Sequence, residues 1–203
     1  MRTIHCQGRN IAPSKIVCIG RNYVAHIAEL GNEVPEEMVV FLKPNSALGD
    51  TLYAVRGEPL HYEGEIAFLV EGGQLSAVGF GLDLTKRDLQ SRLKAQGLPW
   101  ERAKAFDGAA LFSEFVPLTL PVEQLGLELQ VEGTLRQQGS VTSMMYPPQA
   151  ILDNLTSFMT LEDGDIIMTG TPAGVGEISS GQHFQGRVLG TGRVLVEQSW
   201  IAC

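Results

Sequence analysis

The chain is short of cysteine, which excludes one way of building a protein. Its 203 residues include only three cysteines, Cys6, Cys18 and Cys203. An odd number of cysteines without a C-x-x-C pair does not make a disulfide framework, so we expect reduced thiols that pack as small hydrophobic side chains. Reduced thiols are typical of a reducing compartment, and we expect a cytoplasmic protein.

Positive charge is also scarce. The 15 lysines and arginines stand against 23 aspartates and glutamates, and the formal net charge is -8. Binding to phosphate backbones requires an electropositive surface, which this composition does not supply overall. We therefore expect no nucleic-acid partner, while a local basic pocket for an acidic small molecule stays open.

Long apolar runs are missing as well. No run approaches the ~20 residues that a membrane-spanning helix requires, and the N-terminal stretch MRTIHCQGRNIAP lacks the apolar core of a signal peptide. We therefore expect no membrane partner. Hydrophobic residues still make up 44% of the chain, enough for one sizeable core. We expect a single domain over residues 1–203, with a short segment, 1–14, leading into it.

Frequent glycine and proline divide the chain into short elements, because 23 glycines and 10 prolines are spread throughout it. Runs rich in Val, Ile and Leu predict strands at Lys15–Ile19, Val39–Leu42, Glu65–Val70, Ala77–Asp83, Leu127–Val131, Asp165–Thr169 and Arg193–Ser199. Helices are predicted at Tyr23–Leu30, capped by Asn22 and ended by Gly31, and at Thr85–Lys94 and Pro147–Met159. Mostly strand with three short helices predicts a mainly β fold, rolled or sandwiched.

Two glutamates stand at the start of the apolar stretch HYEGEIAFLV, and Asp83 ends another apolar strand. Glu63 and Glu65 share one strand face, because alternate side chains of a strand point the same way. Their Cα atoms would lie about 7 Å apart, and two charges at that separation repel by about 2.4 kcal/mol at an effective dielectric near 20. In a cleft they would need a cation. Three carboxylates suit Mg²⁺, Mn²⁺ or Ca²⁺ better than zinc, although acidic residues are mostly just solvated.

His26 and Glu29 are neighbours on the first predicted helix, three residues apart. A carboxylate one turn away orients an imidazole and raises its basicity, which makes the pair a candidate for acid/base chemistry. By itself, however, a His-x-x-Glu pair is more often part of a polar helix face.

Other polar residues stand at the ends of predicted elements. The loop Thr169–Gly176, TGTPAGVG, has backbone N–H groups that could hold an anion, but it lacks the ending of a phosphate-binding P-loop. Lys43 and Lys104 lie beside apolar residues, where a lysine can be drawn toward an acidic ligand. Further candidates are Arg21, Arg87 and Gln90. Each of these alone is more typical of a surface side chain.

Together, these fragments form an ordered pattern. The pattern comprises Gly20-Arg21-Asn22-Tyr23 with His26-x-x-Glu29, Phe41-Leu42-Lys43-Pro44, His61-x-Glu63-x-Glu65, Asp83-x-Thr85-x-Arg87-Asp88-x-Gln90, Lys104-x-Phe106-Asp107 and Thr169-Gly170-Thr171-Pro172-x-Gly174-Val175-Gly176. It resembles the fumarylacetoacetate hydrolase family, most closely its short bacterial members with one domain. The resemblance extends from about Lys15 to the last predicted strand.

This resemblance implies a fold, an assembly and a set of roles. The fold would be a mixed β-sandwich roll of the type of the family's C-terminal domain, and the assembly a homodimer. A divalent ion, Mg²⁺ with Mn²⁺ or Ca²⁺ as alternatives, would be bound by Glu63, Glu65 and Asp83. His26 and Glu29 would form a catalytic dyad on a lid helix. Substrate would be held by Lys104 and Thr171, with Arg21, Arg87 and Gln90 near the pocket.

The leading hypothesis is a metal-dependent enzyme for 2-oxo acids that works through a stabilised enolate. It would hydrolyse acylpyruvates, or decarboxylate or tautomerise oxaloacetate. Because all three reactions pass through an enolate, the sequence does not distinguish them. One alternative is an isomerase or decarboxylase of 2-hydroxyhepta-2,4-diene-1,7-dioate in aromatic-acid degradation. A second alternative is a non-catalytic family member that binds metal and ligand.

Overall fold

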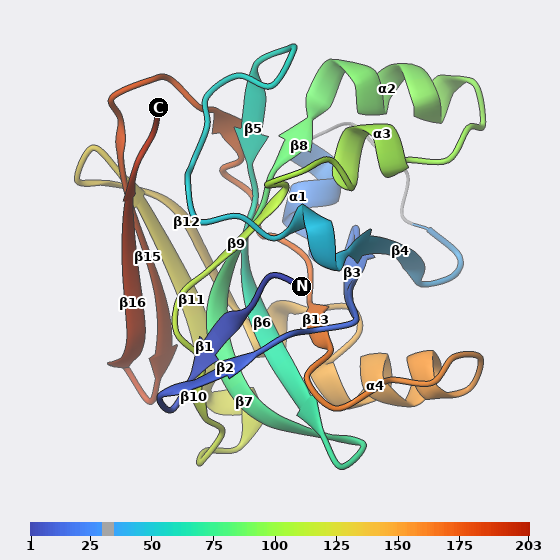
Figure 1. Cartoon of the computed structure of the whole chain (residues 1–203), viewed down its shortest axis with the longest axis vertical. Helices are drawn as coiled ribbons and strands as arrows, with labels where there is room; N and C mark the ends of the chain where they lie inside the picture. The colour runs from blue at the N-terminus through green and yellow to red at the C-terminus, as the bar shows by residue number, and fades with distance from the viewer. Residues whose placement is uncertain (30–34) are drawn as a thin grey trace.

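The computed structural model describes residues 1–29 and 35–203. Strands dominate the described residues, which confirms the predicted mainly β fold (Figure 1). The largest sheet has the strand order β10, β7, β6, β13, β3, β4, with β9 also paired to β7. Its strands are β3 (Lys15–Gly20), β4 (Val39–Pro44), β6 (Gly64–Glu71), β7 (Gln74–Asp83), β9 (Ala110–Phe112), β10 (Val116–Pro117) and β13 (Ile166–Met168). Because β13 runs parallel to β3 and antiparallel to β6, this sheet is mixed.

A second, antiparallel sheet packs against the first. Its order is β12, β11, β15, β16, and it forms the side opposite α2 and α4 in Figure 1. These strands are β11 (Leu125–Val131), β12 (Thr134–Ser140), β15 (His183–Gly190) and β16 (Arg193–Ile201). Two smaller sheets complete the described strands: β1 (Ile4–Cys6) with β2 (Arg9–Ile11), and β5 (Leu60–Tyr62) between β8 (Thr85–Lys86) and β14 (Gly176–Glu177).

The described helices are short. They are α1 (Val24–Glu29), α2 (Arg87–Ala95), α3 (Glu101–Lys104) and α4 (Pro148–Thr156), with single 3₁₀ turns at Asn45–Ala47, Val122–Gln124 and Val141–Ser143. Among the described helices, none has the length and apolar character that a membrane span requires. The first three α-helices gather at the end of the molecule where β6 begins and β7 ends (Figure 1).

The main core lies between the two large sheets, and it confirms the alternation expected for β6. Phe68 on β6 and Phe80 on β7 pack with Phe184 on β15 in this core. A Cβ atom at Gly186 would lie 2.2 Å from the Phe80 ring, so the small residue lets that ring fill the space. Ala67 belongs instead to a second cluster, which includes residues of β3 and β13. Glu63 and Glu65 stand four and two residues before Ala67, so their side chains lie on the same face of the strand as Ala67. They therefore face away from the main core.

Several predicted elements differ from the structure. Thr85 is not helical, because Thr85–Lys86 pairs with β5 as a short strand before α2 begins. The predicted cap at Asn22 is wrong: its side-chain amide donates to the carbonyls of Tyr146 and Thr169, and its oxygen accepts from the Tyr146 N–H. Asn22 thus joins three loops instead of starting a helix. The predicted end of that helix at residues 30 and 31 lies outside the described residues.

The strands β12 and β15 have no predicted counterpart. In β15 the inward positions alternate between Phe184, Gly186, Val188 and Gly190, so glycines occupy two places where an apolar side chain would signal a strand. In β12 most side chains are polar, because the strand lies at the edge of its sheet. Strand prediction from runs of apolar residues therefore misses both strands.

Candidate active site

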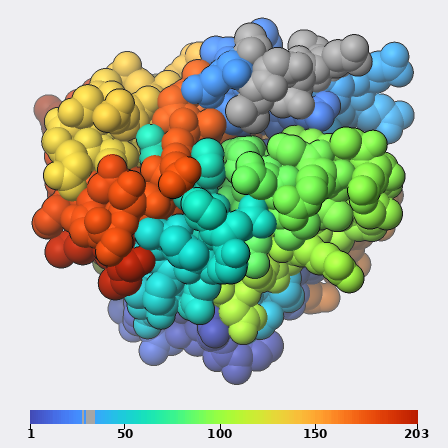
Figure 2. Space-filling view, turned by 90° about the horizontal axis from the view of Figure 1, so that it is seen from above, coloured from blue at the N-terminus to red at the C-terminus, as the bar shows by residue number. Residues whose placement is uncertain are grey.

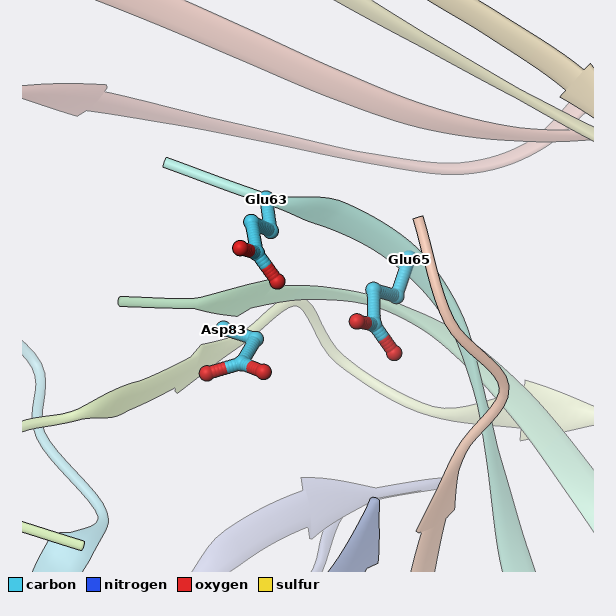
Figure 3. A group of neighbouring side chains, drawn as sticks. All are labelled: Glu63, Glu65 and Asp83. Carbon is cyan, nitrogen blue, oxygen red and sulfur yellow. The ribbon is translucent and has the colours of Figure 1, made fainter. Parts of the chain in front are cut away.

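Three carboxylates meet where β6 begins and β7 ends. Glu63 directly precedes β6, Glu65 is its second residue, and Asp83 is the last residue of β7. Antiparallel pairing places Gly64 opposite Leu82, so these strand ends coincide. Carboxylate oxygens of the three lie within 4.8 Å of one another, and the side chains point toward a common space (Figure 3). The residues are buried, with exposed fractions of 6%, 2% and 1%.

Two cationic side chains compensate Glu63. Lys104 Nζ lies 2.9 Å from Glu63 Oε2 and 2.8 Å from Asp83 Oδ2, and it donates to Thr85 Oγ1 at 2.6 Å. Arg87 also forms an ion pair with Glu63. Burial alone would raise the pKa of Glu63, but Lys104 and Arg87 outweigh it and hold that pKa well below its usual range. Glu63 is therefore an ionised, buried carboxylate.

Glu65 has no such compensation. It accepts a hydrogen bond from the Gly170 N–H at 2.7 Å, and within the described part of the chain it forms no ion pair. Burial raises the pKa of Glu65 well above its usual range, and the charges of Asp83 and Glu63 raise it further. A cation between the three carboxylates would remove this penalty.

One oxygen of Asp83 is also incompletely satisfied. Asp83 Oδ1 lies 2.7 Å from Lys43 Nζ but receives no well-aligned hydrogen bond, because Lys43 donates to the carbonyls of Lys104 and Ala109. Three buried carboxylates with spare acceptor capacity and no sulfur or imidazole ligand fit a hard divalent cation such as Mg²⁺, Mn²⁺ or Ca²⁺.

The His26 and Glu29 side chains are paired, as the sequence predicts. His26 Nδ1 lies 3.3 Å from Glu29 Oε2, and the imidazole is buried. The Glu29 carboxylate accepts the Gly174 N–H, with distances of 3.0 and 3.2 Å to its two oxygens. The glycine-rich loop after β13 thus holds anions through its backbone, as the sequence allows, but the anions are the protein's own Glu29 and Glu65.

A narrow cleft unites almost all of the predicted site residues. They are Arg21, His26, Glu63, Glu65, Asp83, Arg87, Gln90, Lys104 and Thr171. Glu29 does not border the cleft but contacts it through His26. The cleft has a volume of about 30 Å³, room for an ion or one or two waters. Figure 2 shows the molecule from this end, where α2, the segment before β6 and the loop after β13 lie side by side.

A roomier hollow of about 560 Å³ lies elsewhere, beside Arg2, Tyr53 and Arg56. It includes none of the predicted site residues. The narrow cleft is the better candidate for chemistry, because it concentrates buried, mutually perturbed ionisable groups.

One polar residue of the cleft wall is fixed by its neighbours, and another has an unusual backbone conformation. Thr171 Oγ1 donates to the Gly64 carbonyl at 2.9 Å and accepts from Gln137 Nε2 at 2.7 Å. Arg21 has a φ of 56°, in the left-handed region that a non-glycine residue adopts at a cost of about 1 kcal/mol or more. Such strain is often found at functional positions.

Sequence reasoning missed Lys94 and Trp100, which also line the cleft. Lys94 Nζ lies 4.9 Å from the centre of the Trp100 ring. Burial lowers the pKa of Lys94 to about 8, and repulsion from Arg21 adds to that shift while Glu63 opposes it. A signal for Lys94 was present: it follows Arg87 and Gln90 at helical spacing, on the same face of α2.

Residues 15–198 match the family described as "Fumarylacetoacetate (FAA) hydrolase C-terminal". The chain belongs to the fumarylacetoacetate hydrolase family. Its mixed, curled sheets are accordingly the fold of that family's C-terminal domain, and it is an enzyme of this family.

Three similar proteins have names that state an activity. The oxaloacetate tautomerase YcgM of Escherichia coli is 40% identical over 204 residues, covering 90% of this chain and 93% of the relative. The mitochondrial oxaloacetate decarboxylase of Dictyostelium discoideum is 35% identical over 194 residues, covering 87% and 89%. The fumarylpyruvate hydrolase of Pseudomonas aeruginosa, solved with Mn²⁺ and pyruvate, superposes with a TM-score of 0.87 at 30% identity, covering 98% of this chain and 94% of that one.

Proposed function

We propose that this member of the fumarylacetoacetate hydrolase family is a divalent-metal-dependent enzyme for short 2-oxo acids, with keto–enol tautomerisation of oxaloacetate as its main reaction. The observation that carries the proposal is the buried cluster of Glu63, Glu65 and Asp83, with Glu65 uncompensated, in the cleft that His26 also lines. The similarity to oxaloacetate tautomerases supports the choice of substrate.

The metal has a defined place in this proposal. Glu63, Glu65 and Asp83 would hold it, and Mg²⁺ or Mn²⁺ fits their oxygen donors. When bound, the ion supplies Lewis acidity for the negative charge that develops on the 2-oxo oxygen. The choice of Mn²⁺ as a probe is supported by its presence in the related fumarylpyruvate hydrolase.

His26 moves the proton. Glu29 accepts the hydrogen bond from Nδ1–H, which leaves Nε2 as the basic nitrogen of the imidazole. Nε2 removes a proton from C3 of oxaloacetate. The electron pair of that C–H bond forms the C2=C3 double bond, and a proton is delivered to the 2-oxo oxygen, so no other reactant is consumed. The Gly174 N–H keeps Glu29 in place during the transfer.

Other cleft residues would bind and orient the substrate. Arg87 and Gln90 lie one turn apart on α2 and are hydrogen-bonded to each other at 2.9 Å, which presents a rigid pair of donors. Lys104 and Thr171 border the same space and would hold substrate oxygens. Because Gln90, Lys104 and Thr171 are buried, they would also keep bulk water away from the reacting carbon.

Hydrolysis of acylpyruvates is the second candidate activity, supported by the structural similarity to a fumarylpyruvate hydrolase. In that reaction His26 and Glu29 would take a proton from a water, which attacks the distal carbonyl. The C–C bond would then break with its electron pair left on the pyruvate enolate, which takes up that proton to give pyruvate. Decarboxylation of oxaloacetate uses the same enolate and is a side reaction to be measured with it.

One experiment tests the proposal and ranks the reactions. The purified protein, supplied with MgCl₂ or MnCl₂, is assayed for enol exchange and pyruvate release from oxaloacetate, and for pyruvate release from acetylpyruvate and fumarylpyruvate. We expect the largest acceleration for oxaloacetate enol exchange, with loss of activity after chelation by EDTA and recovery when the metal is restored. A rate that survives chelation would overturn the role of the metal. Rates no faster than buffer on all three acids would overturn the proposed function.

A further inference from the structure

One end of the cleft is cationic, and α2 builds it. Arg87, Gln90 and Lys94 stand at positions i, i+3 and i+7 of this nine-residue helix, and all three line the cleft. Arg87 and Gln90 are bonded to each other, and Arg87 is also paired with Glu63. Lys94 lies one turn further along the same face, so it is displaced along the helix axis from the carboxylate cluster.

Lys94 is held in place by an aromatic ring, not by a carboxylate. Its Nζ lies 4.9 Å from the centre of the Trp100 ring, and that ring packs against Phe41 with 5.8 Å between ring centres. Among the residues that the structure describes, no acidic side chain forms an ion pair with Lys94. A cation–π contact orients an ammonium group but leaves its charge uncancelled.

The electrostatic surroundings of Lys94 favour an anion. The ammonium group is half-buried, and the nearby charges of Arg21, Lys104 and Arg87 repel it, while Glu63 is the acidic group that attracts it. These effects lower its pKa to about 8. A carboxylate from a ligand would form an ion pair with the Lys94 ammonium group, whereas an uncharged group would leave its charge unpaired.

We propose that Lys94, positioned by Trp100, binds the second carboxylate of 2-oxo dicarboxylic acids and thereby selects them over 2-oxo acids with an uncharged tail. This inference rests on the proposed function, in which the 2-oxo acid end of the substrate lies at Glu63, Glu65 and Asp83. The distance between the two ends of the cleft then selects substrates by their length, because one molecule must reach both ends.

The first test compares two steady-state constants in the metal-loaded enzyme. Lys94→Met removes the charge and keeps a long side chain, and Lys94→Arg restores the charge. For Lys94→Met we expect the KM for oxaloacetate to rise about tenfold or more, with kcat changed far less. The inhibition constant of pyruvate, which has no second carboxylate, should stay within about twofold. Lys94→Arg should recover most of the lost affinity.

A matched control is Lys86, the last residue of β8. Lys86 Nζ lies 4.8 Å from the Phe106 ring, so it has the same kind of aromatic contact, but it does not line the cleft. Lys86→Met makes the same change in net charge and should leave both constants unchanged. If Lys86→Met raised the KM as much as Lys94→Met, the effect would be long-range electrostatics and the inference would be wrong. Equal weakening of oxaloacetate and pyruvate by Lys94→Met would also overturn it.

A second measurement does not depend on turnover. N-oxalylglycine and N-ethyloxamate share the same oxamate head, and only the first ends in a carboxylate. Calorimetric titration of the Mn²⁺-loaded protein should show tighter binding of N-oxalylglycine, and Lys94→Met should abolish that preference. Equal binding of the two compounds by the wild-type chain would overturn the inference even if oxaloacetate is turned over. Conversely, a preference in a protein inactive on oxaloacetate would sustain it while the proposed reaction fails.

Discussion

At the scale of single residues, the site depends on how burial is compensated. Glu63 and Glu65 are two residues apart at the start of β6 and almost equally buried, yet the pKa of Glu63 is lowered and that of Glu65 is raised. The difference arises because Lys104 and Arg87 form ion pairs with Glu63, whereas among the described residues Glu65 forms no ion pair and accepts the Gly170 N–H. Two identical side chains thus have different electrostatic states in one site.

His26 carries the clearest prediction at this scale. His26→Ala should lower kcat for oxaloacetate enol exchange by about 10²- to 10⁴-fold, because the proton-transferring imidazole is lost. Because the imidazole is buried, a modest fall in the thermal unfolding midpoint should accompany this loss, too small to unfold the protein in the assay. Steady-state kinetics and circular dichroism measure the two quantities.

The matched control is His183→Ala, because His183 is an exposed histidine on β15 whose side chain has no contact with the cleft. This variant should retain wild-type kcat. Full activity in His26→Ala would show that another group moves the proton.

At the scale of elements, the loop after β13 connects the proposed metal ligands with the proposed acid/base pair. Its Gly170 N–H holds Glu65 and its Gly174 N–H holds Glu29. Gly174 has a φ of +102°, and a Cβ atom there would lie 1.9 Å from the Arg136 carbonyl oxygen. Only glycine can therefore keep the loop in this place while its amide points at Glu29.

Gly174→Ala should therefore reduce both stability and activity. We expect a loss of several kcal/mol in the free energy of unfolding, since both the backbone conformation and the contact with Arg136 are violated, and a fall in kcat because Glu29 loses its donor. Gly181→Ala is the control: Gly181 has a φ of +85° but open space around it. It should cost about 1–2 kcal/mol and leave kcat unchanged. Urea unfolding measures the free energy of unfolding, and steady-state kinetics measure kcat. Equal effects of the two variants on these quantities would contradict this account.

A buried carboxylate fixes two neighbouring strands to each other. Asp165 accepts the N–H groups of Ser14, Lys15 and Glu162 and the Ser14 hydroxyl, and it pairs with the Lys15 ammonium. It therefore links the start of β3 to the start of β13 beside it. Burial alone would raise the pKa of Asp165, but the bonds from Lys15 and Ser14 outweigh it and lower the pKa.

The lowered pKa gives the direction of a pH effect. An aspartate whose folded pKa lies below its unfolded value stabilises the fold above the unfolded value, near 3.9, and this contribution is lost as the pH falls through the folded pKa. Asp165→Asn should therefore destabilise the protein by about 2–4 kcal/mol at about pH 7, with a smaller difference from wild type below about pH 4. Urea titrations at several pH values measure this.

Glu71→Gln is the control for Asp165, because Glu71 pairs with an exposed arginine, Arg9. Its removal should leave the free energy of unfolding almost unchanged at every pH. A deficit of Asp165→Asn that stays constant with pH would contradict the assignment of the stabilisation to an ionised carboxylate.

At the scale of the whole molecule, the site lies at one end of the largest sheet, outside the main core. The core lies between the two large sheets, and the ionisable groups gather at one end, where β6, β7, α1, α2 and the loop after β13 meet. The cost of concentrating charge is thus confined to a small region. The homodimer, the single domain and the cytoplasmic location expected from the sequence stay predictions.

Metal binding should therefore stabilise the whole fold. At a free Mn²⁺ concentration about 100 times the dissociation constant, the native state gains about 2.7 kcal/mol, which raises Tm by about 5–10 °C for a chain of this size. Differential scanning calorimetry with MnCl₂ and with EDTA measures this shift. Glu65→Gln should abolish most of it.

Glu71→Gln again provides the comparison, since Glu71 lies at the opposite end of the same strand as Glu65. This variant should keep the wild-type response to Mn²⁺. If Glu65→Gln were stabilised by Mn²⁺ as strongly as wild type, the ion would bind somewhere other than at the three carboxylates.

The sequence by itself determined the features that depend on local periodicity. The two-residue repeat of a strand places Glu63 and Glu65 on one face, and the helical spacing brings His26 near Glu29. The predicted strands from Lys15, Glu65 and Ala77 onward correspond to β3, β6 and β7, because each is a buried apolar run bounded by polar residues or glycine. Where glycines replaced apolar residues, as in β15, the local signal was lost.

Only the tertiary structure decided how these groups are charged and held. Lys104 is 41 positions from Glu63 and 21 from Asp83, yet its ammonium lies between them. The pKa of Lys94 is lowered because the fold buries its ammonium group and brings Arg21 near it from another segment. Electrostatic energy depends on distance in space and on burial, and neither quantity is a function of separation along the chain.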